Sequence, residues 1–351
     1  MSGASNLNVS PSVAVRSFRF LAAALLSGVC IVSAINTTQA KQQTSIFDPS
    51  GSFGTYPSSI NFKGVIAGDY QDSQGIYHGF LRAADGDITA FDPSGSTETE
   101  VTYINGPGDV AGSFRDGDNV FHGFVRASNG VIAAFDPEGS AGTYAIAVNH
   151  AGIVVGYYLD GKSRVHAYVR TADGTVTGFD PKGSTGTYVS GINYEGVIAG
   201  YYQDKNFVLH GFVRTTDGTI TAFDPTGSKN TYVSGINRDG TVTGYYQGNP
   251  FQHGFMRAPD GTITSFDPPG SESTGPSGIN RSGEIVGHYY NKITGDHAFL
   301  RRRNGSTVVF DPAGSSATFA TAINAKGAVT GYYKDDMYHG FLRSDPMKQR
   351  N

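Results

Sequence analysis

A tripeptide, Phe-Asp-Pro, recurs seven times along the chain at a nearly constant spacing. The copies begin at Phe47, Phe91, Phe135, Phe179, Phe223, Phe266 and Phe310, in steps of 44 residues with one step of 43. Each copy opens a unit that reads approximately FDPxGSxxTYxSGINxxGxIxGYYxDxxxxxHGFVRxxDGTITA. A period of this length is typical of proteins that stack one supersecondary unit per repeat. We number these units as repeats one to seven.

The residues within one repeat indicate four short strands. In repeat four, β-branched and aromatic runs separated by Gly, Pro and Asp predict strands A to D at 188–193, 197–203, 210–215 and 219–224. Asp217-Gly218 predicts a tight hairpin between strands C and D. No segment has a 3.6-residue apolar period of useful length, so we expect no long helix.

Three architectures could use such repeats. A β-solenoid coil needs about 20 to 30 residues, and separate beads of this size without disulfides or metal could not bury a core. A propeller buries both faces of each sheet against its neighbours and leaves no long open edge. We therefore predict an all-β fold, a seven-bladed β-propeller of four antiparallel strands per blade over residues 41–345, with a C-terminal tail at 346–351.

The two ends of the repeat array predict how the last blade closes. Repeat seven supplies strands at 319–324, 328–334 and 338–343 and then ends in SDPMKQRN without a fourth strand. Residues 44–47, just before Asp48-Pro49, predict a further strand that belongs to none of the seven sets of strands A to D. We expect this N-terminal strand to pair antiparallel with 338–343 and complete the seventh blade.

The first 40 residues are typical of an export signal. Arg16 and Arg19 precede an apolar stretch at 20–34, and small residues permit cleavage after Ala34 or Ala40. The alternative, a membrane anchor, would need about 20 apolar residues. Cleavage would also remove Cys30, the single cysteine, so neither disulfides nor thiol catalysis is expected. We predict a secreted, periplasmic or cell-surface protein with no membrane span after cleavage.

Net charge and composition limit the classes of partner that the chain could bind. The chain of 351 residues has a formal net charge of -4, which offers no basic field for nucleic acid. Its 12% aromatic and 16% charged residues are the reverse of a disordered composition. We expect a monomer, no cofactor and no metal. The Asp116-Gly117-Asp118-Asn119 segment lacks the remaining ligands of a calcium loop and is interpreted as a turn.

The repeats resemble a known family. The units GYYQDxxxxxHGFVRxxDGTITAFDPxGS are similar to the HAF-repeat family of probable extracellular bacterial proteins, and His297-Ala298-Phe299 has that core. The resemblance covers about 44–343 and implies secretion and a propeller-like fold, without a catalytic or ligand-binding assignment. The middle residue of the core is Gly in five copies, which departs from the family name.

Residues present in every repeat are interpreted as structural, because a single site in a ring requires asymmetry. A histidine begins strand C in each repeat, at His78, His122, His166, His210, His253, His297 and His339. A three-residue CD loop would place His210 opposite Asp224 and Gly211 opposite Phe223, whereas a two-residue turn would separate His from Asp. We favour the first register.

Three further sets recur. The asparagines that end strand A should bond their own turns, namely Asn61, Asn105, Asn149, Asn193, Asn237, Asn280 and Asn324. The strand B glycines should allow close packing between blades, namely Gly68, Gly112, Gly156, Gly200, Gly244, Gly287 and Gly331. Arg82 and its counterparts should cover apolar surface with their stems.

Departures from the repeat are the candidate site. The residue after the strand B glycine is Tyr in four repeats, one of which has Tyr332. The other three repeats have Asp69, Ser113 and His288 there. In a closed ring repeats six, seven, one and two are consecutive, so the three changes share one sector. Asp69 with His288 could form an acid/base pair, and His288 with Tyr332 could bind a polar ligand, although drift at a tolerant position also explains them. The BC loops, which vary between repeats, are the other candidate region.

Three functional classes follow. We favour a secreted propeller that binds a glycan, peptide or small molecule through its BC loops. The alternatives are a propeller lyase or hydrolase with one site in the same sector, and a structural surface or matrix protein. The sequence contains no GxSxG, HExxH or P-loop signature and no Trp, the strongest stacking platform for sugars. No catalytic residue is assigned.

Overall fold

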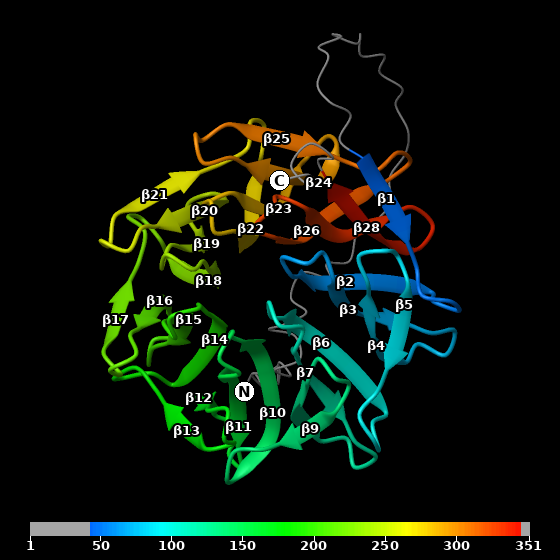
Figure 1. Cartoon of the computed structure of the whole chain (residues 1–351). Helices are drawn as coiled ribbons and strands as arrows, with labels where there is room; N and C mark the ends of the chain where they lie inside the picture. The colour runs from blue at the N-terminus through cyan, green and yellow to red at the C-terminus, as the bar shows by residue number, and fades with distance from the viewer. Residues whose placement is uncertain (1–42, 345–351) are drawn as a thin grey trace, which may run out of the picture. The chain divides into compact units, whose positions relative to one another are not determined.

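The computed structural model describes residues 43–344, and that part of the chain is all β (Figure 1). It contains 28 strands, and no α-helix is assigned within the described range. Consistent with this, residues 43–344 contain no helix that is long and apolar enough to cross a membrane. The signal peptide predicted at 1–40 and the tail at 346–351 lie outside the described residues.

After β1 (Gln43–Phe47), repeats one to six each supply four strands and repeat seven supplies three. Repeat one has β2 (Gly54–Ile60), β3 (Ile66–Gln71), β4 (Tyr77–Arg82) and β5 (Ile88–Phe91). Repeat two has β6 (Glu98–Ile104), β7 (Val110–Arg115), β8 (Phe121–Arg126) and β9 (Ile132–Phe135). Repeat three has β10 (Ser140–Val148), β11 (Val154–Asp160), β12 (Val165–Arg170) and β13 (Val176–Phe179).

The later repeats follow the same order. Repeat four has β14 (Gly186–Ile192), β15 (Ile198–Gln203), β16 (Leu209–Arg214) and β17 (Ile220–Phe223). Repeat five has β18 (Asn230–Ile236), β19 (Val242–Gln247), β20 (Gln252–Arg257) and β21 (Ile263–Phe266). Repeat six has β22 (Ser273–Ile279), β23 (Ile285–Asn291), β24 (Gly295–Arg301) and β25 (Thr307–Phe310). Repeat seven has β26 (Ala317–Ile323), β27 (Val329–Lys334) and β28 (Tyr338–Ser344).

Within each repeat the strands pair antiparallel in sequence order. Repeats two, three and four each form a separate four-stranded sheet. Repeats five and six share one eight-stranded sheet, joined by a single parallel bridge between Gln252 and Ser273. Repeats seven and one are joined in the same way through Tyr338 and Gly54. The repeats follow one another around a common centre in Figure 1.

The N-terminal strand pairs with the last one. β1 lies antiparallel to β28, with Thr44 opposite Arg343 and Phe47 opposite Gly340. Phe47 is buried and packs edge-on against Phe80 at 6.1 Å between ring centroids. The pairing expected between 44–47 and 338–343 is therefore present. It joins repeat seven to residues that precede repeat one.

The core lies between the sheets of neighbouring repeats. One cluster, for example, packs Ala147, Val155 and Ala167 of repeat three against Ile192 and Phe212 of repeat four. The first strand of each repeat contacts the first strand of the next, and β26 contacts β2. This cycle of contacts runs through all seven repeats.

The asparagines that end strand A do more than was predicted. Asn193 Oδ1 accepts the N–H of Val197 at 2.8 Å, which is the expected bond within the turn. In addition, five of the seven asparagines donate Nδ2–H to the carbonyl oxygen of the equivalent Asn in the next repeat. The bond from Asn324 to the Asn61 carbonyl, at 3.0 Å, links the last repeat to the first.

The predicted register between strands C and D is confirmed. Gly211 lies opposite Phe223, and His210 Nδ1 lies 2.7 Å from Asp224 Oδ2. All seven histidines make this contact at 2.7–2.8 Å, with His339 using Asp48. In six repeats the second carboxylate oxygen accepts the Oγ1–H of a strand A threonine, as Thr231 donates to Asp224. Each such aspartate therefore joins His of one repeat to Thr of the next.

The repeated arginine and glycine have contacts that explain their recurrence. The Arg82 guanidinium lies 5.0 Å from the centroid of the Phe47 ring, and the six equivalent arginines lie 4.2–5.0 Å over the Phe that opens their own repeat. We predicted that the strand B glycines allow close packing between blades, and this was wrong, because the close neighbour lies in the same repeat. A Cβ at Gly200 would lie 2.2 Å from the Tyr188 carbonyl oxygen, within the same repeat. The register shift between Val189 and Gly191 accompanies this close approach.

Candidate functional site

The residue after the strand B glycine lies opposite a strand A residue in every repeat, which gives seven equivalent pairs. We use the name belt for Tyr56, Asp69, Glu100, Ser113, Tyr144, Tyr157, Tyr188, Tyr201, Tyr232, Tyr245, Gly275, His288, Phe319 and Tyr332. Each repeat contributes one strand A and one strand B member, paired in register.

In repeats three to five the belt is entirely tyrosine. Tyr188 stacks on its cross-strand partner Tyr201 at 5.1 Å between ring centroids, and Tyr232 stacks on Tyr245 at 4.7 Å. Between repeats, Tyr201 meets Tyr232 edge-on at 5.5 Å. Burial raises the pKa of Tyr201 far above its usual value, so its hydroxyl stays protonated. This part of the belt is a stack of neutral rings that connects neighbouring sheets.

Polar residues interrupt the belt in repeats one and two. Asp69 replaces the strand B tyrosine of repeat one, and repeat two has Glu100 on strand A with Ser113 opposite. Their exposed fractions are 8%, 6% and 2%, so all three side chains are buried. Asp69 and Glu100 face the boundary between repeats one and two. Their equivalents at the boundary between repeats three and four are Tyr157 and Tyr188, whose rings are in contact. Two carboxylates are therefore placed at adjacent positions of the belt.

Glu100 is the functional candidate that the sequence analysis missed. At the strand B position, Asp69 and Ser113 stand out from the tyrosines of four other repeats. The same comparison at the strand A tyrosine would have found Glu100, Gly275 and Phe319 as departures. Ser113 Oγ accepts the N–H of Ala145 at 3.1 Å, so this hydroxyl also ties repeat two to repeat three.

His288 and Tyr332 lie on the same belt but farther along it. His288 meets Phe319 edge-on at 5.1 Å, Phe319 stacks on Tyr332 at 5.1 Å, and Tyr332 meets Tyr56 at 5.4 Å. Asp69 lies opposite Tyr56. The structure therefore links His288, Tyr332 and Asp69 through Phe319 and Tyr56, whereas Ser113 lies opposite Glu100 in repeat two. Desolvation lowers the pKa of His288 to about 4, which keeps the imidazole neutral at pH 7.

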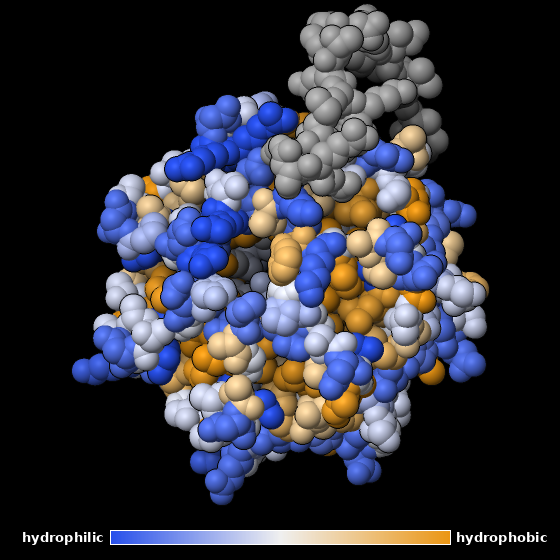
Figure 2. Space-filling model, in the orientation of Figure 1, coloured by the Kyte–Doolittle hydropathy of each residue, from blue (hydrophilic) through white to orange (hydrophobic). Residues whose placement is uncertain are grey.

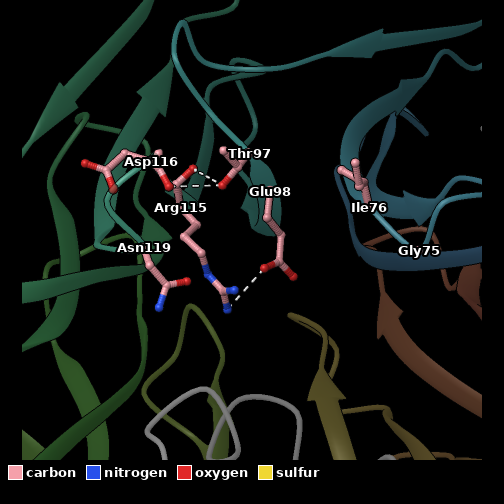
Figure 3. Close-up of a pocket in the computed structure, with 8 residues that line it drawn as sticks. Gly75, Ile76, Thr97, Glu98, Arg115, Asp116 and Asn119 are labelled. Carbon is pink, nitrogen blue, oxygen red and sulfur yellow. Dashed lines mark hydrogen bonds and ion pairs between the residues drawn. The ribbon is translucent and has the colours of Figure 1, made fainter.

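A pocket of about 350 Å³ lies beside the polar part of the belt (Figure 3). It is bounded by the BC loops of repeats one and two and the start of β6, through Gly75, Ile76, Thr97, Glu98, Arg115, Asp116, Gly117 and Asn119. Glu98 and Arg115 form an ion pair at 3.2 Å between Oε2 and Nη2. The pocket therefore offers an ion pair, a hydroxyl, an amide and one apolar side chain. Two of the predicted BC loops come together here.

Strand register connects this pocket to the belt. Glu98 lies opposite Arg115 and Glu100 lies opposite Ser113, two residues farther along the same two strands. Residues two apart on a strand project to the same side of the sheet. Burial raises the pKa of Tyr144 to about 12. The negative charges of Glu100 and Glu98 add to this rise, and the positive charge of Arg115 opposes it. The pocket and the polar interruption thus belong to one electrostatic environment.

Two groups with metal-ligand chemistry have structural explanations. Asp116 Oδ1 accepts the N–H groups of Asp118 and Val120 at 2.9 Å, which confirms the turn interpretation of that segment. Within residues 43–344, the one His/Asp group close enough to share a cation is Asp335, Asp336 and His339. His339 Nδ1 is already 2.7 Å from Asp48, in the contact that every repeat has.

The inner part of the face drawn in Figure 2, outside the area under grey atoms, gathers apolar residues, and hydrophilic residues surround it.

Comparison with known proteins identifies solved structures of similar architecture. No family model and no curated protein sequence matches the chain. Among solved structures, virginiamycin B lyase from Staphylococcus aureus is similar with a TM-score of 0.55 and 16% identity, over 86% of this chain and 99% of that one.

Two further solved structures are similar at low identity. The β-propeller domain of the Trilobed protease from Pyrococcus furiosus has a TM-score of 0.59 and 10% identity, over 83% of this chain and 95% of that one. Puromycin hydrolase has a TM-score of 0.61 and 13% identity, over 86% of this chain and 53% of that one. The protein therefore has a β-propeller fold, and identities this low transfer no activity.

Proposed function

We propose that the protein is an exported ligand-binding β-propeller of seven four-stranded blades, each blade one repeat and the last completed by β1. The contacts that run from β2 around to β26 and back, and the pairing of β1 with β28, support this blade count and closure. The export segment at 1–40 and the likeness to HAF repeats support a secreted or periplasmic location.

The single observation that carries the binding function is the position of the pocket. It lies between the BC loops of repeats one and two, where the tyrosine belt gives way to Asp69, Glu100 and Ser113. A repeated scaffold that breaks its own pattern beneath two loops has the asymmetry that a unique site needs. Carboxylates, an amide and a hydroxyl beside aromatic rings suit a polar small molecule or a sugar residue.

The enzyme alternative rests on Asp69 and His288, which belong to repeats one and six, with Phe319, Tyr332 and Tyr56 linking them along the belt. A structural role rests on the recurring contacts alone. Binding is preferred over both because the residues that depart most from the repeat are buried next to a pocket. Glycans and metabolites remain the ligand classes to screen.

The test is a glycan and metabolite screen on the purified chain from Lys41, followed by variants of the pocket. Arg115→Met should weaken binding of any ligand found by at least about tenfold, because a charged hydrogen-bond donor is lost. Arg303→Met, on an exposed turn of repeat six, is the matched control and should bind as the wild type does. Unchanged binding by Arg115→Met, with an unchanged melting temperature, would place the site elsewhere.

A further inference from the structure

We propose that His122 and His78 are positioning residues of the pocket, which fasten its two loop walls when each imidazole ring takes up a proton. This inference rests on the proposed function and adds the regulation of that site. Each histidine faces an aspartate in the BC loop of its own repeat, and these two loops bound the pocket. A ligand in the pocket should therefore bind more tightly at mildly acidic pH than at alkaline pH.

The BC loop of repeat two is closed by one carboxylate. Asp116 Oδ1 accepts the N–H groups of Asp118 and Val120 at 2.9 Å. Asn119 lies between these two residues, lines the pocket and has a φ of +66°, a left-handed conformation that is costly for a residue other than glycine. The loop therefore depends on Asp116 for its shape. The second oxygen, Asp116 Oδ2, lies 3.1 Å from His122 Nε2.

The BC loop of repeat one is built in the same way. Asp72 Oδ1 accepts the N–H groups of Gln74 and Ile76 at 2.8 and 2.9 Å, and the Ile76 residue lines the pocket. Asp72 Oδ2 lies 3.6 Å from His78 Nε2, which is close enough for an ion pair. The other ring nitrogen, His78 Nδ1, lies 2.7 Å from Asp92 Oδ2. Both walls are therefore held by an aspartate that faces a histidine.

The proton on the ring decides whether this contact attracts or repels. His122 Nδ1 lies 2.7 Å from Asp136 Oδ2, and a carboxylate only accepts hydrogen bonds, so a neutral ring carries its one proton on Nδ1. Nε2 then presents a lone pair to Asp116 Oδ2, and two acceptors that face each other repel. A protonated ring donates from both nitrogens and joins the two carboxylates. The same holds for His78.

The surroundings of the two rings favour the proton. The groups that face His122 are Asp136, Asp116 and the Phe114 ring. Those that face His78 are Asp92, Asp72 and the Tyr70 ring, whose pKa is raised by burial and by both carboxylates. Burial alone would lower the pKa of His78, but hydrogen bonds and charges from the two carboxylates raise it above 6.5. Backbone N–H groups lower the pKa of Asp72, which therefore stays ionised over this range.

Two other repeats contain natural controls. In repeat six His297 Nε2 lies 2.8 Å from Thr294 Oγ1, a hydroxyl that can donate to a neutral ring. In repeat five Gly248 follows β19 where the loop aspartate stands in repeats one and two. Among residues 43–344, the carboxylate paired with His253 is Asp267 alone, through Nδ1. Neither of these loops needs a protonated histidine to keep its shape.

The fastening of the loops is tested without a ligand, by amide hydrogen exchange on the chain from Lys41. Protection of the Val120 and Ile76 amides is corrected for the intrinsic effect of pH on exchange. It should be about three- to tenfold higher at about pH 5.5 than at about pH 8, because a charge-assisted hydrogen bond is gained. The Ile293 amide, which donates to Asn291 Oδ1 in repeat six, is the internal control and should show no such gain.

The matched variant is Asp116→Asn. Its side-chain oxygen can still accept the N–H groups of the loop, and its amide can donate to the neutral Nε2 of His122. The Val120 amide should therefore be protected equally at both pH values. Wild-type protection that is equal at both values or falls on acidification would overturn the inference, and so would a variant that keeps the wild-type pH dependence. Nitrogen chemical shifts that place the neutral proton on Nε2 would also overturn it.

A binding measurement separates this inference from the function on which it rests. A compound from the glycan and metabolite screen that does not itself titrate between about pH 5.5 and 8 should bind about three- to tenfold more tightly at the lower value. If Arg115→Met abolishes binding but wild-type affinity is the same at both values, the proposed function stands and the regulation is overturned. If Arg115→Met binds as the wild type does, both are overturned, whatever the loops do.

Discussion

The outer edges of the repeats and the belt near their centre are built from the same seven units, yet they differ in regularity. At the outer edge every repeat has its His–Asp contact at 2.7–2.8 Å and its Arg over a Phe ring. In the belt, repeats three to five keep stacked tyrosines, whereas repeats one and two replace three rings by Asp69, Glu100 and Ser113.

This difference separates residues that hold the repeats together from residues that can recognise something. A contact that recurs seven times solves a problem that every repeat boundary has, which is attachment to the next sheet. Buried polar residues that only two repeats have at these positions give the belt the asymmetry that a unique binding site requires. The same reasoning assigns stability to the outer edge and binding to the interrupted belt.

The largest effect is expected from removing the N-terminal strand. A chain that begins at Ser50 lacks β1, the buried Phe47 ring and the Asp48 carboxylate that contacts His339. Burial of Phe47 alone should be worth about 3–5 kcal/mol of unfolding free energy. Thermal melting followed by circular dichroism should show a large drop relative to the chain from Lys41. An unchanged melting temperature would mean that β1 does not close the ring.

A smaller effect is expected within the outer network. His210→Ala removes one partner of Asp224, which keeps Thr231, and about a quarter of the His210 side chain is exposed. We expect a loss of about 1 kcal/mol in unfolding free energy from His210→Ala. Asp224→Ala, which disconnects His210 and Thr231 together, should cost about 2 kcal/mol. Equal unfolding free energies for Asp224→Ala and the wild type in denaturant titrations would contradict this role.

The outer network should also depend on pH. Burial alone would lower the pKa of His122, but hydrogen bonds and charges from Asp136 and Asp116 raise it above 6.5. The protonated ring can donate Nδ1–H to Asp136 and Nε2–H to Asp116, at 2.7 and 3.1 Å. Hydrogen bonds from backbone N–H groups and from His122 lower the pKa of Asp116 below 3.8, so its contribution persists down to that range.

The stability that His122 contributes is therefore complete below its unfolded pKa of about 6.5 and declines as pH rises through the higher folded value. We expect the melting difference between wild type and His122→Asn to be larger at about pH 5.5 than at about pH 8. Calorimetric scans at both values measure it. A difference that grows with rising pH would reverse the assignment of charge in this contact.

The smallest effect on stability is expected in the belt. Asp69→Tyr with His288→Tyr restores the tyrosine found at this position in four other repeats. Because stacked rings occupy the equivalent places in repeats three to five, unfolding free energy should change by less than about 1 kcal/mol. Binding of a ligand identified in the screen should nevertheless be weakened, because the double variant removes the polar groups of Asp69 and His288 from the belt. Strong destabilisation of the double variant would show that these residues are structural.

Much of the fold could be predicted because the repeat averages out local ambiguity. Seven copies of one pattern located the strands of repeat four to within two residues at each end, and turn geometry fixed the contact of His210 with Asp224. The partner of Gly200 was not predictable, because the register shift in β14 that brings the Tyr188 carbonyl close leaves no mark in composition.

The candidate site was predicted less completely. Asp69 and Ser113 stood out against the tyrosines of the other repeats, but Glu100 became a candidate only when register placed it opposite Ser113. The pocket depends on how Ile76 of one BC loop faces Arg115 of the next repeat, which is a matter of three-dimensional arrangement. The bonds from five of the asparagines to the equivalent Asn in the next repeat were likewise not predictable from a single unit.

The most direct test of the division between outer edge and belt measures two variants by the same two assays. His210→Ala and Glu100→Gln are each followed by thermal melting and by calorimetric titration with a ligand identified in the glycan and metabolite screen. The account predicts that His210→Ala melts earlier and binds as the wild type, whereas Glu100→Gln melts as the wild type and binds at least about tenfold more weakly. The reverse pattern, with binding lost in His210→Ala and retained in Glu100→Gln, would contradict it.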